Sequence, residues 1–236
     1  MLNQESFGPP KFVNPGEPHL ACVLLLDTSG SMIGPPIDSL NKALQDFVTQ
    51  VSMDDMAQKR VDVAIVEFNN SANPVQPFTP ISQMTPVKLN ATGATAMGAG
   101  INLAIDMLKD RNRLYDSMGT KCYRPWIFMI TDGEPTDELE MAKKRIVEEE
   151  GKGEYGKLKF FALGVPGYKK ETLIDLTRHQ TRPRIMELEN FDFTGIFKWM
   201  SDSMVTISVS KVSEEVALPR LPGNAKVIDP QDTSGF

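Results

Sequence analysis

Four apolar runs along the chain predict buried β-strands. They lie at residues 20–26 (LACVLLL), 61–68 (VDVAIVEF), 126–131 (WIFMIT) and 158–165 (LKFFALGV). The first and third runs lack the polar alternation of a half-exposed strand, which is typical of parallel strands covered on both faces. A shorter run at residues 184–188 indicates one further strand.

Segments with helical periodicity separate these strands. Between Ile37 and Val51 apolar residues recur at three- and four-residue steps, and Pro36 suits a first helical turn. Similar spacing indicates helices around residues 101–108, 139–146, 171–178 and 193–204. The segment PVQPF at residues 74–78 holds two prolines, so it is an edge strand at best. These elements predict an α/β fold with a doubly wound, mostly parallel sheet, helices on both faces and one antiparallel edge strand.

Proline and glycine mark the ends of the predicted folded unit. Residues 1–18 contain GPP and PGEP, which disfavour regular structure and predict an extended N-terminal arm. Residues 19–210 hold all the predicted strands and helices, and a chain of 236 residues with 41% apolar side chains can build one such domain. Residues 211–236 have a similar composition to the arm and predict a flexible C-terminal tail.

The charge balance disfavours several classes of partner. The net charge of −6 and the pI near 5.1 argue against nucleic acid, because proteins that bind its backbone usually carry a basic excess. The N-terminus shows no basic and apolar leader, and the longest apolar run is far shorter than the roughly 20 residues that span a bilayer. We therefore expect a soluble, cytoplasmic protein with no membrane partner.

The remaining candidate residues favour packing or solvation over catalysis. Cys22 and Cys122, the two cysteines of the chain, lie in or beside apolar runs and are expected to be small buried hydrophobes in a reducing compartment. His19 and His179 have no evident serine or cysteine partner and are expected at the surface. The charged run at residues 143–157 is expected to be a solvated helix end and loop.

Three oxygen-rich loops are expected at the carboxyl edge of the sheet. They are DTSGS from Asp27, ATGAT around Thr95 and TDGEPTD around Asp132. Asp27 and Asp132 each end an apolar strand, so adjacent parallel strands would bring the two carboxylates close together. Two like charges in a partly dry site need a cation or a proton between them.

The ligand chemistry of these loops indicates a divalent cation. The hydroxyls of Ser29, Ser31 and Thr95 are neutral oxygen ligands, and with two carboxylates and water they could complete the octahedral shell of Mg²⁺. Mn²⁺ and Ca²⁺ use the same oxygen ligands. The loops contain no cysteine or histidine, which disfavours zinc and copper. With only two negative ligands, the metal would stay electrophilic enough to accept a carboxylate from outside.

The three loops, in this order, resemble the metal-ion-dependent adhesion site of von Willebrand factor A (VWA) domains. The resemblance runs from about residue 20 to 210, and VEFNNSANPVQPF, GATAMGAGINLAIDML, WIFMITDGEPTD and FFALGV resemble the bacterial TerY-type VWA proteins associated with tellurite resistance. It implies that five residues coordinate the metal: Asp27, Ser29, Ser31, Thr95 and Asp132. Ala94 stands where many members have the second glycine of Gly-Gly-Thr.

The resemblance also implies a function. A vacant metal position would take a Glu or Asp from a protein partner, in a stress or phosphorylation-linked system with a kinase and a phosphatase as neighbours. The chain would then be a non-enzymatic interaction module. Glu134 and Asp137 lie close to the site and could tune it or contact the partner, but they are expected to be solvated loop acids. Met32 and Ile33 lie at the rim of the site, where they serve either a contact surface or the core.

Two alternatives remain open from the residues. One is a Mg²⁺-dependent phosphoryl-transfer enzyme with Asp27 as nucleophile, although Ser29 stands where that chemistry normally places a second carboxylate. The sequence holds no complete phosphate-binding Gly-x-x-x-x-Gly-Lys-Ser/Thr loop, which disfavours NTP hydrolysis. The other is a structural domain without metal, in which the same residues form turns and helix caps.

Overall fold

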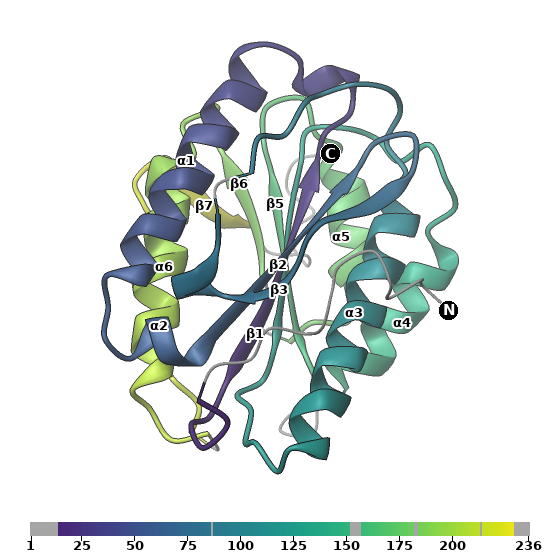
Figure 1. The fold of residues 1–236 in the computed structure, drawn as a ribbon. Helices are drawn as coiled ribbons and strands as arrows, with labels where there is room; N and C mark the ends of the chain where they lie inside the picture. The colour runs from purple at the N-terminus through teal and green to yellow at the C-terminus, as the bar shows by residue number, and fades with distance from the viewer. Residues whose placement is uncertain (1–13, 86, 152–156, 182–183, 213, 229–236) are drawn as a thin grey trace.

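A twisted sheet of seven strands organises the computed structural model, which describes residues 14–85, 87–151, 157–181, 184–212 and 214–228 (Figure 1). The strand order is β3-β2-β1-β4-β5-β6-β7. The central strands from β2 to β6 are parallel, and β3 and β7 run antiparallel at the two edges. The strands are β1 (Leu20–Asp27), β2 (Val61–Phe68), β3 (Ala72–Pro80), β4 (Trp126–Thr131), β5 (Lys159–Gly164), β6 (Ile185–Leu188) and β7 (Ala225–Ile228).

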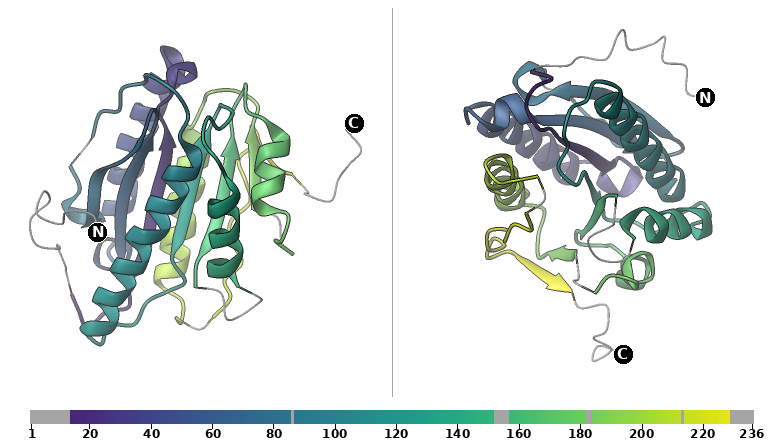
Figure 2. Two further views of the ribbon diagram at one scale, coloured as in Figure 1. Left: turned by 90° about the vertical axis from the view of Figure 1, so that its right-hand side faces the viewer. Right: turned by 90° about the horizontal axis from the view of Figure 1, so that it is seen from below.

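Helices cover both faces of this sheet (Figure 2). They are α1 (Pro35–Ser52), α2 (Ala57–Arg60), α3 (Met97–Ser117), α4 (Glu140–Glu150), α5 (Lys170–Thr177) and α6 (Thr194–Ser208), with 3-10 turns η2 (Gly30–Met32) and η3 (Ile81–Gln83). Helices α1 and α6 pack on one face, whereas α3, α4 and α5 pack on the other. The predicted doubly wound α/β fold is confirmed.

Strand β1 shows why its sequence is apolar throughout. All eight of its residues are buried. Leu24 and Leu26 point into the core beneath α1 and α6, while Val23 and Leu25 point into the core beneath α3. Because successive side chains of a strand face opposite sides of the sheet, a strand covered on both faces cannot alternate apolar with polar residues.

The chain reverses its winding direction between β1 and β4. From β1 it proceeds to β2 and β3 on one side, and from β4 to β5, β6 and β7 on the other. The crevice at such a switch point, outside the carboxyl ends of the strands, is where open α/β sheets bind ligands. The first and third oxygen-rich loops leave these two strands.

The edges of the sheet differ in part from the prediction. Strand β3 is the predicted antiparallel edge strand; it carries Pro74, Pro77 and Pro80, and its register with β2 shifts around Ile65. Proline lacks the N–H that an inner strand needs, which explains its place at an edge. The opposite edge carries a second antiparallel strand, β7, which the sequence does not predict because its four residues, AKVI, lie among prolines and polar residues.

Part of the predicted C-terminal tail packs on the domain. Val216, Leu218 and Leu221 are partly buried against the core beneath α1 and α6. The indole of Trp199 donates a hydrogen bond of 2.9 Å to the carbonyl of Pro219. The sequence does not predict this packing, because these apolar residues are widely spaced and lie among prolines. Residues 229–236 of the tail, like residues 1–13 of the predicted arm, lie outside the described residues.

Both predictions of surface histidines need correction. His19 is fully buried, and its Nδ1 lies 2.8 Å from Asp62 Oδ2. Tyr115 donates a hydrogen bond of 2.5 Å to the same oxygen, and Arg111 lies 3.0 Å from it. Burial raises the pKa of Asp62, but the hydrogen bond with His19 and the charge of Arg111 outweigh it and leave this pKa below its ordinary value. His179 is half-buried and contacts Glu150.

The charged run at residues 143–157 is not simply solvated, because Glu149 and Glu150, the last two of the three glutamates at the end of α4, are buried. Glu150 is 2% exposed and accepts hydrogen bonds from the backbone of Phe160, from Gln180 and from Arg184. The sequence could not show this, since β5 and the loop after α5 supply the partners. Cys22 is buried as predicted, whereas Cys122 is half-buried. None of the helices in the described part of the chain combines the length and apolar character that a bilayer crossing requires.

Candidate metal centre

Strands β1 and β4 bring the two aspartates of the site to one edge. Leu26 pairs with Ile130 in the parallel ladder, so Asp27 ends β1 beside Thr131, and Asp132 follows at once. Asp27 is 0% exposed and Asp132 is 4% exposed. The predicted juxtaposition of these carboxylates at the carboxyl edge is therefore present.

The turn after β1 places two hydroxyls between the carboxylates. The backbone N–H of Ser29 donates to Asp27 Oδ1 at 2.8 Å, and the hydroxyls of Ser29 and Ser31 lie 3.0 Å apart. The Ser31 hydroxyl donates to Asp132 Oδ1 at 2.7 Å. A continuous chain of polar contacts thus joins the first loop to the third.

Backbone contacts fasten the second loop to the first. Gly30 N donates to the Gly93 carbonyl at 3.0 Å, and Thr92 N donates to the Thr28 carbonyl at 2.8 Å. Ala94, the departure from Gly-Gly-Thr, does not adopt a positive φ, and its N–H donates to Asn70 Oδ1 at 2.9 Å. An alanine is therefore accommodated without backbone strain at that position.

Thr95 faces the same space as Asp27. A Cβ added to Gly133 would lie 3.2 Å from Thr95 Oγ1 and 3.6 Å from Asp27 Oδ2. Glycine at this position leaves open a small cradle between the hydroxyl and the carboxylate. The structure thus brings all five predicted site residues to one edge of the sheet, although Ser31 alone among them is exposed.

Three residues support the site: Thr131 and Thr136 escaped the sequence analysis, and Asp137 has another role than the one predicted. The hydroxyl of Thr131 donates a hydrogen bond of 2.6 Å to Asp27 Oδ2. Thr136 exchanges two hydrogen bonds with the backbone of Thr95, and Asp137 accepts the N–H groups of Gly98 and Ala99 at the start of α3. Asp137 is therefore a helix-capping residue and not a solvated loop acid. The pairing of β1 with β4 is the signal that points to Thr131.

Burial shapes the electrostatics of both carboxylates. It raises the pKa of Asp27, against the hydrogen bonds from Ser29 and Thr131, and the charge of Asp132 raises it further. Burial also raises the pKa of Asp132, against its hydrogen bond from Ser31. Burial thus disfavours the ionised form of both carboxylates, and a cation bound between them would stabilise both negative charges.

The donor set fits a hard divalent cation. Every side-chain donor that converges here is oxygen: carboxylates from Asp27 and Asp132, and hydroxyls from Ser29, Ser31 and Thr95. Oxygen ligands suit Mg²⁺, Mn²⁺ and Ca²⁺. Within the described residues, no group of three or more His, Cys, Asp and Glu side chains is arranged to hold a metal, so any cation held here depends on hydroxyls.

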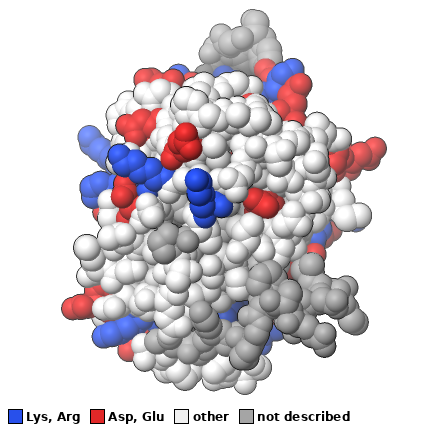
Figure 3. Space-filling model, turned by 45° about the horizontal axis from the view of Figure 1, so that its top comes forward, with Lys and Arg blue, Asp and Glu red and all other residues white. Residues whose placement is uncertain are grey.

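The surface around the site is mixed in character. Ile33 is 63% exposed, whereas its neighbour Met32 is fully buried in the core. Glu134, predicted to be solvated, forms an ion pair with Lys169 from the loop before α5. Figure 3, in which this edge comes forward, shows acidic and basic side chains interspersed over a mostly uncharged surface.

The fold and the site define a class: a doubly wound α/β domain with oxygen-rich loops meeting at its switch point. The chain belongs to the von Willebrand factor type A domain family, whose family model matches residues 22–199. Domains of this family are generally interaction modules and not enzymes, and they often bind a divalent metal. No curated protein sequence matches the chain.

Solved structures share the fold at low identity. The pilus adhesin SpaC from Lactobacillus rhamnosus GG is 14% identical with a TM-score of 0.63, over 84% of this chain and 31% of that one. Proximal thread matrix protein 1 from the mussel byssus is 16% identical with a TM-score of 0.53, and the match covers 90% of this chain and 49% of that one. A von Willebrand factor type A protein from Catenulispora acidiphila is 16% identical with a TM-score of 0.53, and the match covers 80% of this chain and 43% of that one. This chain thus spans less than half of each.

Proposed function

We propose that this domain is a non-enzymatic, metal-dependent protein-interaction module. Its ligands are the five predicted residues, Asp27, Ser29, Ser31, Thr95 and Asp132, and its cation is Mg²⁺, with Mn²⁺ or Ca²⁺ served by the same chemistry. The observation that carries the proposal is the convergence of two buried carboxylates on one chain of hydroxyls. A bound cation would offer a coordination position to a Glu or Asp side chain of a protein partner.

The chain's own residues prepare this site. The Ser29 N–H and the Thr131 hydroxyl donate hydrogen bonds to the two oxygens of Asp27 and so fix the orientation of its carboxylate. Gly133 leaves the space beside Thr95 free. Exposed Ile33 offers an apolar contact next to the serines, which suits a partner whose acidic residue has an apolar neighbour.

The enzymatic alternative has weaker support. Ser29 stands two residues after Asp27, where that chemistry normally places a second carboxylate as the acid and base.

The resemblance to TerY-type proteins suggests a biological setting. We propose that the partner belongs to a bacterial stress system, of the tellurite-resistance or phosphorylation-linked kind, with a kinase and a phosphatase among its components. The shared loops and the family membership support this setting.

Affinity capture in Mg²⁺ and in EDTA tests the proposed function. Three immobilised proteins are compared: the wild type, Asp27→Ala and the control Asp38→Ala, which alters an exposed acid in the first turn of α1. The proposal expects one partner to be retained by the wild type and the control, and only in Mg²⁺. Equal retention by Asp27→Ala would contradict it.

A further inference from the structure

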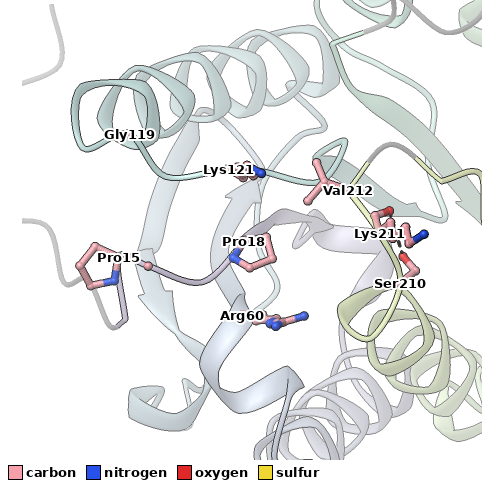
Figure 4. A pocket seen from close by; sticks show the side chains of 9 residues that line it. Pro15, Pro18, Arg60, Gly119, Lys121, Ser210, Lys211 and Val212 are labelled. Atoms are coloured by element: carbon pink, nitrogen blue, oxygen red, sulfur yellow. Dashed lines mark hydrogen bonds between the residues drawn. The ribbon is translucent and has the colours of Figure 1, made fainter.

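A hollow lies at the amino ends of the parallel strands, at the end of the sheet opposite to the candidate metal centre. It has a volume of about 540 Å³ and is formed by segments that precede β1, β2 and β4 and by the segment that follows α6 (Figure 4). The eight residues of β1 separate it from Asp27, a distance of about 25 Å at the usual rise per residue. It is therefore independent of the site described above.

The charged side chains that line this hollow are all basic. Arg60 comes from the end of α2, Lys121 from the segment after α3, and Lys211 from the segment after α6. These three residues line one hollow although the chain as a whole carries a net charge of −6. Cations that line the same hollow without a balancing carboxylate repel one another, so a bound anion would stabilise them.

Arg60 forms a fixed wall of the hollow. Its Nε donates to Glu17 Oε2 at 3.0 Å, and its Nη1 donates to the Ser208 carbonyl at 2.5 Å. Its side chain is only 15% exposed. Glu17 balances its charge and orients its guanidinium, so the net positive charge of the hollow comes from the two lysines.

Lys121 and Lys211 are both exposed. Within the described part of the chain, neither forms an ion pair with a carboxylate. Their charge matches a phosphate monoester, which carries about −1.5 to −2 at pH 7 and three strong acceptor oxygens. A single carboxylate would balance only one of them. Pro15, Pro18 and Val212 add apolar walls that can contact the group bearing the phosphate.

We propose that this hollow binds a phosphate monoester, with Lys121 and Lys211 as the cations that hold it and Arg60 as the wall against which it rests. The phosphate could belong to a free small molecule or to a phosphorylated side chain of a peptide. The two sources share the same recognition chemistry, and the probes below distinguish them.

Titrations of the full-length, ¹⁵N-labelled protein test the proposal. The probes are O-phosphoserine, a short peptide with a central phosphoserine, and the same peptide with glutamate or serine in its place. We expect saturable amide shifts at Gly119, Lys121 and Lys211 with both phosphorylated probes. Tighter binding of the phosphopeptide would identify a phosphorylated side chain as the source, and equal affinity would identify a small phosphate monoester.

Matched variants make the result specific. Lys121→Ala/Lys211→Ala is expected to weaken binding by about tenfold or more, because each charged contact is lost. Lys88→Ala/Lys144→Ala, two exposed lysines outside the hollow, should bind like the wild type, and so should Asp27→Ala. The proposal fails if no saturable shift occurs, if the glutamate peptide binds as well as the phosphopeptide, or if both double variants behave alike.

Discussion

The hydroxyl of Ser31 donates a hydrogen bond of 2.7 Å to Asp132, which stands 101 residues further along the chain. This contact joins the turn after β1 to the loop after β4, at the point where the sheet reverses its winding direction. Together with the hydrogen bond from Thr131 to Asp27, it ties both carboxylates to hydroxyls of the opposite strand end. The following predictions concern these contacts and the parts of the fold that support them.

Thr131→Val is expected to lower both the stability of the domain and its affinity for a divalent cation. The variant removes the hydroxyl that orients buried Asp27, at a cost of about 1–3 kcal/mol in the free energy of unfolding. Urea unfolding in EDTA measures the first effect, and calorimetric titration with Mn²⁺ measures the second. Thr131→Ser keeps the hydroxyl and should stay near the wild type; a valine variant as stable as the wild type would argue against this role.

Gly133→Ala is expected to weaken metal binding without unfolding the domain. The new methyl group would stand 3.2 Å from Thr95 Oγ1 and fill the cradle between this hydroxyl and Asp27. We expect the Mn²⁺ affinity to fall by about tenfold while the free energy of unfolding changes by about 1 kcal/mol or less. Gly223→Ala is the matched control, since a Cβ there meets nothing within 4 Å. An unchanged Mn²⁺ affinity in Gly133→Ala would contradict the cradle.

Glu150→Gln is expected to destabilise the domain most at neutral pH. Burial raises the pKa of Glu150, but hydrogen bonding to His179 and the charge of Arg184 hold it below its ordinary value. A carboxyl with a depressed folded pKa stabilises the protein above its unfolded pKa, and this contribution is lost as the pH falls through the folded pKa. The variant should lose about 3 kcal/mol at pH 7 and progressively less toward about pH 3.

Urea unfolding across that pH range measures the difference between Glu150→Gln and the wild type. Glu148→Gln, which alters an exposed acid two residues earlier on the same helix, should show a small difference that does not depend on pH. A constant difference for Glu150→Gln over the whole range would show that its charge is not what stabilises the fold.

Removal of residues 211–236 is expected to destabilise the domain. The deletion uncovers Trp199, removes its hydrogen bond to Pro219 and strips β7 from β6. A loss of about 2 kcal/mol would lower the melting temperature by roughly 4–8 °C for a domain of this size. Val227→Ala, at a side chain that is 54% exposed, should leave it unchanged within about 2 °C. An unaltered melting temperature after truncation would support the flexible tail that the composition suggests.

The fold was largely predictable because the inner strands are covered on both faces. Strands β1 and β4 need continuous apolar runs, and such runs stand out in the sequence. The contacts of Asp62 with His19 and Arg111 did not stand out, because three polar residues from separate elements satisfy one another only in the folded protein. Strand β7 escaped prediction because four residues at an edge carry no clear periodicity.

The site was predictable to the extent that loop order and strand pairing determine it. Asp27 and Asp132 could be placed at one edge because each follows an apolar strand, and the structure brings them to neighbouring strand ends. Thr131 and Asp137 were missed because their roles depend on hydrogen bonds across loops, which residue type alone does not reveal. A direct measurement of metal binding tests the five proposed ligands.

Calorimetric titration of the chelator-treated protein with Mn²⁺ is that measurement. It compares the wild type with Asp27→Ala, Asp132→Ala and the control Asp38→Ala. We expect a single binding site in the wild type and in the control, and an affinity lower by at least about tenfold in each of the two site variants. Binding that survives unchanged in Asp27→Ala and Asp132→Ala, or a wild type that binds no Mn²⁺ while folded, would contradict the central claim.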